Sequence, residues 1–132
     1  MKLAFSYKDL SEQLHVPLPE SNRVIRSVAF DTRRIIGGED VLFFALKGKF
    51  RDGHEFIQTA YDKGVRSFVV SQKMNASNFD GATFIQVEDT LKALQSLAKM
   101  HREKFSIPVV GITGSAGKTI VKEWLGQLLE EE

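Results

Sequence analysis

Short apolar runs alternate with amphipathic segments along most of this 132-residue chain. Four of the runs have the length of a buried strand, and each predicts one. They lie at 23–30, 41–46, 65–71 and 82–87. Three other segments place apolar residues at the spacing of a helix face; they begin at Ser6, at Asp52, and at Asp89 or Thr90. Because strands and helices alternate, the sequence predicts an α/β fold.

The first two predicted helices begin with a reciprocal capping pair. Ser6 can accept a hydrogen bond from the backbone of Asp9, while the Asp9 side chain bonds back to Ser6. Asp52 and Glu55 have the same spacing at the second helix, and Gly64 suits the end of that helix. These local signals agree with the apolar pattern.

Composition and charge narrow the class of protein. The chain has 18 basic and 17 acidic residues, so its net charge of +1 gives no support for nucleic-acid binding. It has no cysteine, and its histidines and carboxylates show no metal-ligand spacing. No apolar run approaches the roughly 18 residues of a membrane span, and the N-terminus lacks the apolar region of a signal peptide. We therefore expect a cytoplasmic protein.

The last part of the chain carries candidate chemistry. The apolar run 107–112 predicts a strand, which a glycine-rich turn joins to a helix that starts near Lys118. Glycines let backbone N–H groups point at phosphate oxygens, so this turn is predicted to cradle a nucleoside triphosphate. The predicted cradle consists of Gly114, Ser115, Ala116 and Gly117. Lys118 would be the catalytic cation at the β- and γ-phosphates, and the Thr119 hydroxyl would bind Mg²⁺.

The match to the phosphate-loop pattern is incomplete, because Ile112 stands where the strict pattern has its first glycine. A turn that only connects a strand to a helix is the alternative. Pro108 disfavours helix at the residue before it, so we place a boundary there, with one domain at 1–105 and the start of another at 106–132. Few residues follow the loop, and we expect the second domain to be truncated.

Two parts of the sequence resemble the Mur ligase family. Residues 113–119, Thr-Gly-Ser-Ala-Gly-Lys-Thr, are similar to the ATP loop of this family, which includes folylpolyglutamate synthases. Upstream, the blocks at 31–33, 41–48 and 52–56 resemble, in order and spacing, the N-terminal domain of MurF-type ligases. The resemblance implies a mixed sheet with flanking helices, as in the N-terminal domains of MurE and MurF. The first strand, phosphate loop and helix of an ATP domain would follow.

The resemblance also implies a reaction, namely that of an ATP- and Mg²⁺-dependent ligase for peptidoglycan precursors. Such a ligase phosphorylates the carboxylate of UDP-N-acetylmuramoyl-tripeptide and joins the acyl phosphate to D-alanyl-D-alanine. This chain alone would be inactive. Residues 117–125 further resemble chains in which a MurF-like half precedes an alanine racemase, which would add pyridoxal phosphate only if a racemase domain follows. The alternatives are another Mur or folylpolyglutamate-type ligase, and a stand-alone UDP-sugar-binding or scaffold module.

The resemblance implies, finally, which residues hold the UDP part of the substrate. The implied contacts are Thr32, Arg33, Lys47, Gly48, Asp52, Gly53 and His54. Arg33 could bind phosphate through paired hydrogen bonds, and the capped helix start near Asp52 could attract an anion. From the residues alone, plainer roles are open: Arg33 in an ion pair at a solvated strand end, Asp52 as a cap, and His54 as a packing residue.

Overall fold

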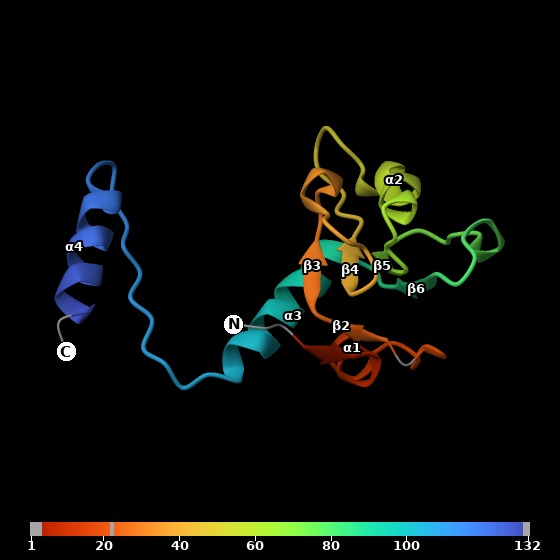
Figure 1. Cartoon of the computed structure of the whole chain (residues 1–132), viewed down its shortest axis with the longest axis horizontal. Helices are drawn as coiled ribbons and strands as arrows, with labels where there is room; N and C mark the ends of the chain where they lie inside the picture. The colour runs from red at the N-terminus through yellow and green to blue at the C-terminus, as the bar shows by residue number, and fades with distance from the viewer. Residues whose placement is uncertain (1–3, 22, 131–132) are drawn as a thin grey trace.

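The computed structural model describes residues 4–21 and 23–130. Figure 1 shows a body that contains every element up to α3, an extended segment, and a separate helix α4 at the far end of the molecule. The helices are α1 (Tyr7–Leu14), α2 (Ile57–Asp62), α3 (Thr90–Glu103) and α4 (Lys118–Glu130), and the 3-10 helices are η1 (Thr32–Arg34), η2 (Gly53–Phe56) and η3 (Ala76–Asn78). The strands are β1 (Phe5–Ser6), β2 (Val24–Ile25), β3 (Ser27–Ala29), β4 (Val41–Phe44), β5 (Ser67–Val70) and β6 (Thr83–Gln86).

The central sheet has four parallel strands in the order β3-β4-β5-β6. Its register pairs Val28 with Leu42 and Phe43 with Phe68. A separate antiparallel pair joins β1 to β2, with Phe5 opposite Ile25. The predicted α/β fold is confirmed, and the expected mixed sheet takes the form of a parallel sheet beside a small antiparallel pair.

Helices cover both faces of the parallel sheet. Alternate residues of a strand point to opposite faces, so Leu42 and Phe44 lie on one side and Phe43 on the other. Leu42 and Phe44 pack in a buried cluster with residues of α1 and α3, including Leu10 and Leu97. Phe43 belongs to a second buried cluster with residues of α2. The continuous apolar character of β4 follows from burial on both sides.

The first and third helices begin where the sequence predicts. At α1 the Ser6 backbone N–H donates to Asp9 Oδ2 at 2.8 Å, and the Asp9 N–H donates to Ser6 Oγ at 3.1 Å. At α3 the cap is Asp89, whose Oδ1 accepts from the N–H groups of Leu91 and Lys92. Thr90 instead lies inside the helix and donates its hydroxyl to the Ala45 carbonyl at 3.0 Å.

Two predicted strands differ from the structure. Residues 23–30 do not form one strand, because β2 and β3 belong to different sheets. Residues 107–112 form no strand at all, although α4 begins at Lys118 as predicted. A strand needs a neighbour for its backbone N–H and C=O groups, and the described chain supplies none beside this segment. Val109 and Val110 are accordingly exposed.

The described helices are also too short or too polar for a lipid bilayer. Within residues 4–21 and 23–130, no helix combines the length and apolar character that crossing a membrane requires.

Candidate functional site

A groove of about 280 Å³ lies where β3 and β4 end. The residues that line it are Phe30, Asp31, Thr32, Arg33, Leu46, Arg51, Gly53 and Phe56. The groove thus brings together the segment after β3 and the segment after β4, which carry the two blocks predicted to hold UDP. Ligands of α/β proteins bind outside the carboxyl ends of parallel strands. The volume suits part of a nucleotide, since pockets for whole small molecules span roughly 300–1,000 Å³.

The segment after β3 turns directly into the 3-10 helix η1, where the sequence predicts a polar strand end. Asp31 caps η1 by accepting from the Arg33 backbone N–H at 3.0 Å. The Arg33 guanidinium folds back onto the same carboxylate, with Nη2 2.7 Å from Oδ2. These bonds lower the pKa of Asp31 from 3.8 to about 2, and the bonds from the Arg33 side chain contribute more than the bond from its backbone. The ion pair considered for Arg33 is therefore present, although the Arg33 side chain stays 82% exposed.

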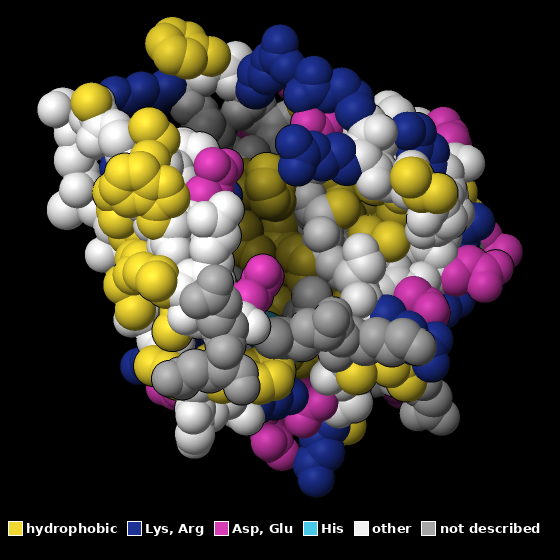
Figure 2. Space-filling model, turned by 60° about the vertical axis from the view of Figure 1, so that its left-hand side comes forward, with side chains coloured by type: hydrophobic (Ala, Val, Ile, Leu, Met, Phe, Trp, Pro, Cys, Tyr) yellow, Lys and Arg dark blue, Asp and Glu magenta, His cyan; other side chains and the backbone are white. Residues whose placement is uncertain are grey.

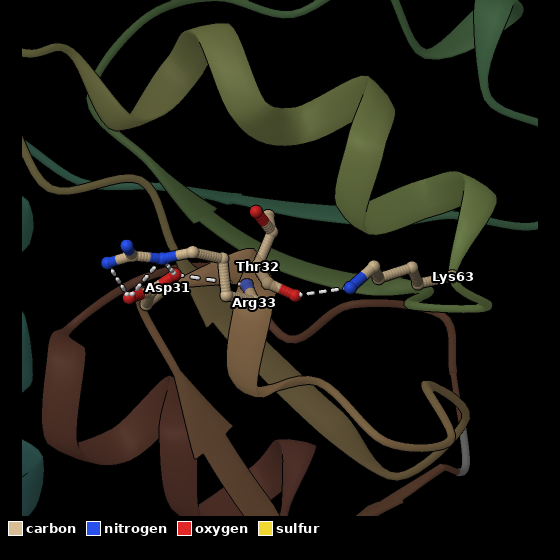
Figure 3. Close-up of polar contacts among 4 residues, drawn as sticks. All are labelled: Asp31, Thr32, Arg33 and Lys63. Carbon is tan, nitrogen blue, oxygen red and sulfur yellow. Dashed lines mark hydrogen bonds and ion pairs between the residues drawn. The ribbon is translucent and has the colours of Figure 1, made fainter.

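Thr32, which stands between Asp31 and Arg33 in the sequence, is buried. Its carbonyl accepts a hydrogen bond from Lys63 Nζ at 2.7 Å, and Figure 3 shows Lys63 reaching it from the side opposite Arg33. Lys63 follows the last residue of α2, so the bond ties η1 to that helix. Asp31 and Lys63 thus each hold the backbone of η1 by a hydrogen bond.

The segment after β4 forms a small hairpin. Lys47 and Asp52 make an antiparallel bridge, and the Gly48 N–H donates to the Arg51 carbonyl at 2.9 Å. Gly53 closes the hairpin by donating to the Leu46 carbonyl at 2.8 Å. A Cβ at Gly53 would lie 2.5 Å from the Leu46 nitrogen, so only glycine fits there without a backbone shift. Of the predicted contacts in this segment, Gly53 lines the groove, whereas Lys47 and Gly48 do not.

Asp52 and His54 brace the hairpin against β5. Asp52 Oδ1 accepts from the His54 N–H at 3.0 Å and lies 2.5 Å from His54 Nδ1. His54 Nε2 accepts from the Ser71 N–H at 3.0 Å, so the ring proton must sit on Nδ1 and point at Asp52. The His54 N–H and ring lower the pKa of Asp52. With both nitrogens engaged and only 6% of its side chain exposed, His54 offers no free group to the groove.

The predicted second helix begins differently from its sequence pattern. Asp52 is a cap, as predicted, but it caps the 3-10 turn η2, which runs into α2. Among the described residues, the Glu55 side chain makes no return bond to Asp52, so the predicted capping box is wrong. Gln72 donates to the second Asp52 oxygen at 3.0 Å instead. This helix start is already occupied by a carboxylate, and we assign no anion to it.

The predicted phosphate loop lies apart from the groove, at the start of α4 (Figure 1). Gly117 has a φ of +77°, a conformation that favours glycine. Lys118 Nζ donates to the Gly114 carbonyl, so the lysine folds over its own loop. Thr119 follows in the first turn of α4 and is exposed. The candidate triphosphate cradle therefore has Lys118 and the Thr119 hydroxyl beside the loop, and both residues are exposed.

Arg51 is the polar lining residue that sequence motifs miss. It stands between the Lys-Gly and Asp-Gly-His blocks and matches neither, and only the hairpin turns it toward the groove. Figure 2 shows Lys and Arg side chains gathered at the top of the molecule, the end where Figure 1 places the hairpin between β4 and α2. Across the described ranges, no three His, Cys, Asp or Glu side chains meet in a way that could hold a metal ion.

Comparisons with known proteins relate this chain to one family. The family described as "Mur ligase family, catalytic domain" matches residues 24–102. The UDP-N-acetylmuramoyl-tripeptide–D-alanyl-D-alanine ligase of Synechocystis is 39% identical over 107 residues, which is 81% of this chain and 23% of that protein. The UDP-N-acetylmuramoyl-L-alanyl-D-glutamate–2,6-diaminopimelate ligase of Clostridioides difficile is 35% identical over 114 residues. These residues are 83% of this chain and 22% of that protein. The chain thus spans about a quarter of the length of these curated relatives.

Solved structures agree with the sequence relatives. The UDP-N-acetylmuramoylalanyl-D-glutamyl-2,6-diaminopimelate–D-alanyl-D-alanyl ligase of Acinetobacter baumannii matches with a TM-score of 0.82 at 26% identity, over 98% of this chain and 29% of that one. The MurF ligase of Thermotoga maritima, solved in complex with ADP, matches with a TM-score of 0.65 at 34% identity, over 81% and 24%. Since the family match covers more than half of the chain and these similarities agree with it, the chain belongs to the Mur ligase family.

Proposed function

We propose that this chain is the part of a MurF-type ligase that holds the UDP end of UDP-N-acetylmuramoyl-tripeptide. In the whole enzyme, the γ-phosphoryl group of ATP passes to the carboxylate of the UDP-linked peptide, and ADP leaves. The amine of D-alanyl-D-alanine then displaces inorganic phosphate and forms the new amide bond. Since the chain spans about a quarter of its relatives, other residues complete the ATP site and the dipeptide site.

The groove is the observation that carries this proposal. Its wall of Phe30, Leu46 and Phe56 offers apolar surface to a nucleoside, while Arg33 offers hydrogen-bond donors at the rim. Gly53 lets the hairpin pass close to the backbone of Ala45 and Leu46. The buried Thr32 shapes the wall through its backbone. We assign Asp52 and His54 the task of holding the hairpin in place, and we assign Lys47 and Gly48 to the hairpin itself.

The loop at 113–117 supports an ATP site in the whole enzyme. Gly114, Ser115, Ala116 and Gly117 would cradle the phosphates of ATP. Lys118 would then leave the Gly114 carbonyl and stabilise charge on the transferred phosphoryl group, while Thr119 would hold Mg²⁺. The ADP bound by the Thermotoga maritima relative supports adenine nucleotide as the ligand. In this chain the loop stands exposed, so we expect ATP to bind weakly.

Calorimetric titration of this chain with UDP tests the proposed groove. We expect UDP to bind to the unaltered chain and Arg33→Ala to weaken that binding by about tenfold, which matches one lost charge-assisted hydrogen bond. Arg34→Ala is the matched control, because Arg34 is the next arginine in η1 but lies outside the groove lining. Absence of UDP binding would refute the proposal. Tight ATP binding would refute only the expectation that the exposed loop binds ATP weakly in this chain.

A diaminopimelate-adding ligase is the second candidate, because such an enzyme from Clostridioides difficile is 35% identical to this chain. Both candidates start from a UDP-N-acetylmuramoyl-peptide, so the groove does not distinguish them. An assay of amide formation by the whole enzyme, with D-alanyl-D-alanine and with 2,6-diaminopimelate as the amine, would distinguish the two candidates. A stand-alone UDP-sugar module predicts neither product. The racemase fusion, its pyridoxal phosphate and the cytoplasmic location stay predictions from the sequence.

A further inference from the structure

We propose that Arg51 binds the diphosphate of the UDP-linked substrate at the rim of the groove. This inference rests on the proposed function and adds to it the residue that recognises the diphosphate. It follows from three observations on the described residues: which arginines have protein partners, how the hairpin holds Arg51, and where the positive charge of the groove is left uncompensated.

Most arginine side chains near the sheet are already bound to the protein. Their partners are backbone carbonyls for Arg23 and Arg66, Asp40 for Arg26, and Asp31 for Arg33. Within the described part of the chain, the Arg51 and Arg34 guanidinium groups have no such partner. Arg51 lines the groove, whereas Arg34 lines a different cavity beside β3. Arg33 uses Nε and Nη2 on Asp31, so it offers a ligand mainly Nη1, whereas the whole Arg51 guanidinium is available.

The hairpin fixes the backbone of Arg51 before any ligand arrives. The Arg51 carbonyl accepts from the Gly48 N–H, and the next residue pairs with Lys47 in the antiparallel bridge. That next residue, Asp52, is held in turn by His54 and Gln72. Because the backbone is already fixed, binding a ligand costs less conformational entropy. Only the side chain of Arg51 must order when it meets an anion.

Charge decides between the two arginines of the groove. Asp31 lies against Arg33 and remains ionised at neutral pH, so this pair carries no net charge. Within the described part of the chain, Arg51 forms no ion pair, because Asp31 pairs with Arg33 and Asp52 with His54, so Arg51 leaves one positive charge at the groove. A guanidinium fork matches phosphate oxygens through paired hydrogen bonds. Because the groove volume suits only part of a nucleotide, the nucleoside fits inside and the diphosphate lies at the rim.

Uridine and UDP, titrated against the chain and its variants at one ionic strength, test this assignment. For Arg51→Ala we expect UDP affinity to fall about 10- to 100-fold, the usual cost of a lost charge-assisted hydrogen bond, and uridine affinity to stay unchanged. Arg51→Lys should keep the charge but recover only part of the affinity. Arg34→Ala removes the same charge outside the groove and should leave both ligands within about twofold.

The outcomes separate the inference from the proposed function. If the unaltered chain binds neither uridine nor UDP, both fail. If it binds UDP but Arg51→Ala changes nothing, or weakens uridine as much as UDP, the diphosphate assignment is overturned while the groove stands. An equal loss with Arg34→Ala would overturn it too, because general charge attraction would then explain the effect. Unchanged circular dichroism of each variant checks that the fold is intact.

Discussion

The Asp31 carboxylate lies in the candidate groove, and its ionisation can be measured directly. Bonds from the Arg33 side chain and backbone lower its pKa to about 2, from 3.8 for an ordinary aspartate. A depressed carboxyl pKa stabilises the fold fully above pH 4, and that contribution disappears as the pH falls from about 4 to about 2. We predict a midpoint near 2 for Asp31 in a carboxyl-carbon NMR titration.

The Arg33→Ala variant tests the cause of this low pKa. It removes the guanidinium bonds but keeps the N–H of residue 33, so the midpoint should rise part of the way toward 3.8. Arg34→Ala is a suitable control, because Arg34 acts on Asp31 only through weaker Coulomb attraction. An unchanged midpoint in Arg33→Ala would show that the guanidinium does not contact the carboxylate.

Two glycines of the hairpin should respond differently to an added methyl group. A Cβ at Gly53 would lie 2.5 Å from the Leu46 nitrogen and 2.8 Å from the Ala45 carbonyl carbon, so Gly53→Ala forces backbone to move. We predict a loss of about 1–3 kcal/mol in the free energy of unfolding, measured by urea denaturation. Gly48→Ala meets only the Arg51 oxygen at 3.4 Å and is the matched control. Equal losses would contradict the close approach at Gly53.

At the scale of residues, the sequence predicts which segment lies at the groove better than it predicts the role of each residue. The Asp-Gly-His motif indicates the hairpin, yet His54 uses both ring nitrogens in bonds within the protein. The second nitrogen depends on Ser71, 17 residues away, which no local pattern reveals. Arg51 is missed for the same reason, because its position in the groove follows from the bridge between Lys47 and Asp52.

At the scale of elements, the start of α3 depends on a single side chain. Asp89 accepts from two backbone N–H groups that no helical carbonyl can reach. We predict that Asp89→Ala lowers the free energy of unfolding by about 1 kcal/mol, measured by urea denaturation. Glu88→Ala removes an exposed charge just before the cap and should change it by less than about 0.5 kcal/mol. If both variants lost the same amount, loss of charge and not of the cap would be the cause.

Elements with local signals are predictable, and elements that need distant partners are not. The capping pair of Ser6 and Asp9 determines where α1 begins, and both bonds are formed. The division of 23–30 has no local cause, because Ile25 pairs with β1 while Val28 pairs with β4. The apolar run 107–112 has strand composition but no neighbouring strand, so composition alone predicts it wrongly.

At the scale of the whole molecule, the groove and the phosphate loop sit on different parts. The groove belongs to the body, where α1, α2 and α3 cover the parallel sheet. The loop belongs to an arm, residues 106–130, that ends in α4, and α4 has no buried residue. If both sites bind ligands as we propose, they can act together only when further protein contacts hold the arm near the body. The domain boundary at residues 105 and 106 stays a prediction from the sequence, and the exposed apolar side chains of α4 agree with the expectation that this helix lacks packing partners.

The single tryptophan reports whether the arm is independent of the body. Trp124 lies on α4 with 63% of its surface exposed, so its fluorescence maximum should be that of an indole in water. We predict that urea unfolding of the body gives a cooperative change in far-UV circular dichroism without a matching transition in Trp124 fluorescence. Trp124→Phe should leave the midpoint of the body unchanged, since Trp124 belongs to neither buried cluster of the described residues. Coincident transitions by both probes would mean that α4 packs against the body and unfolds with it.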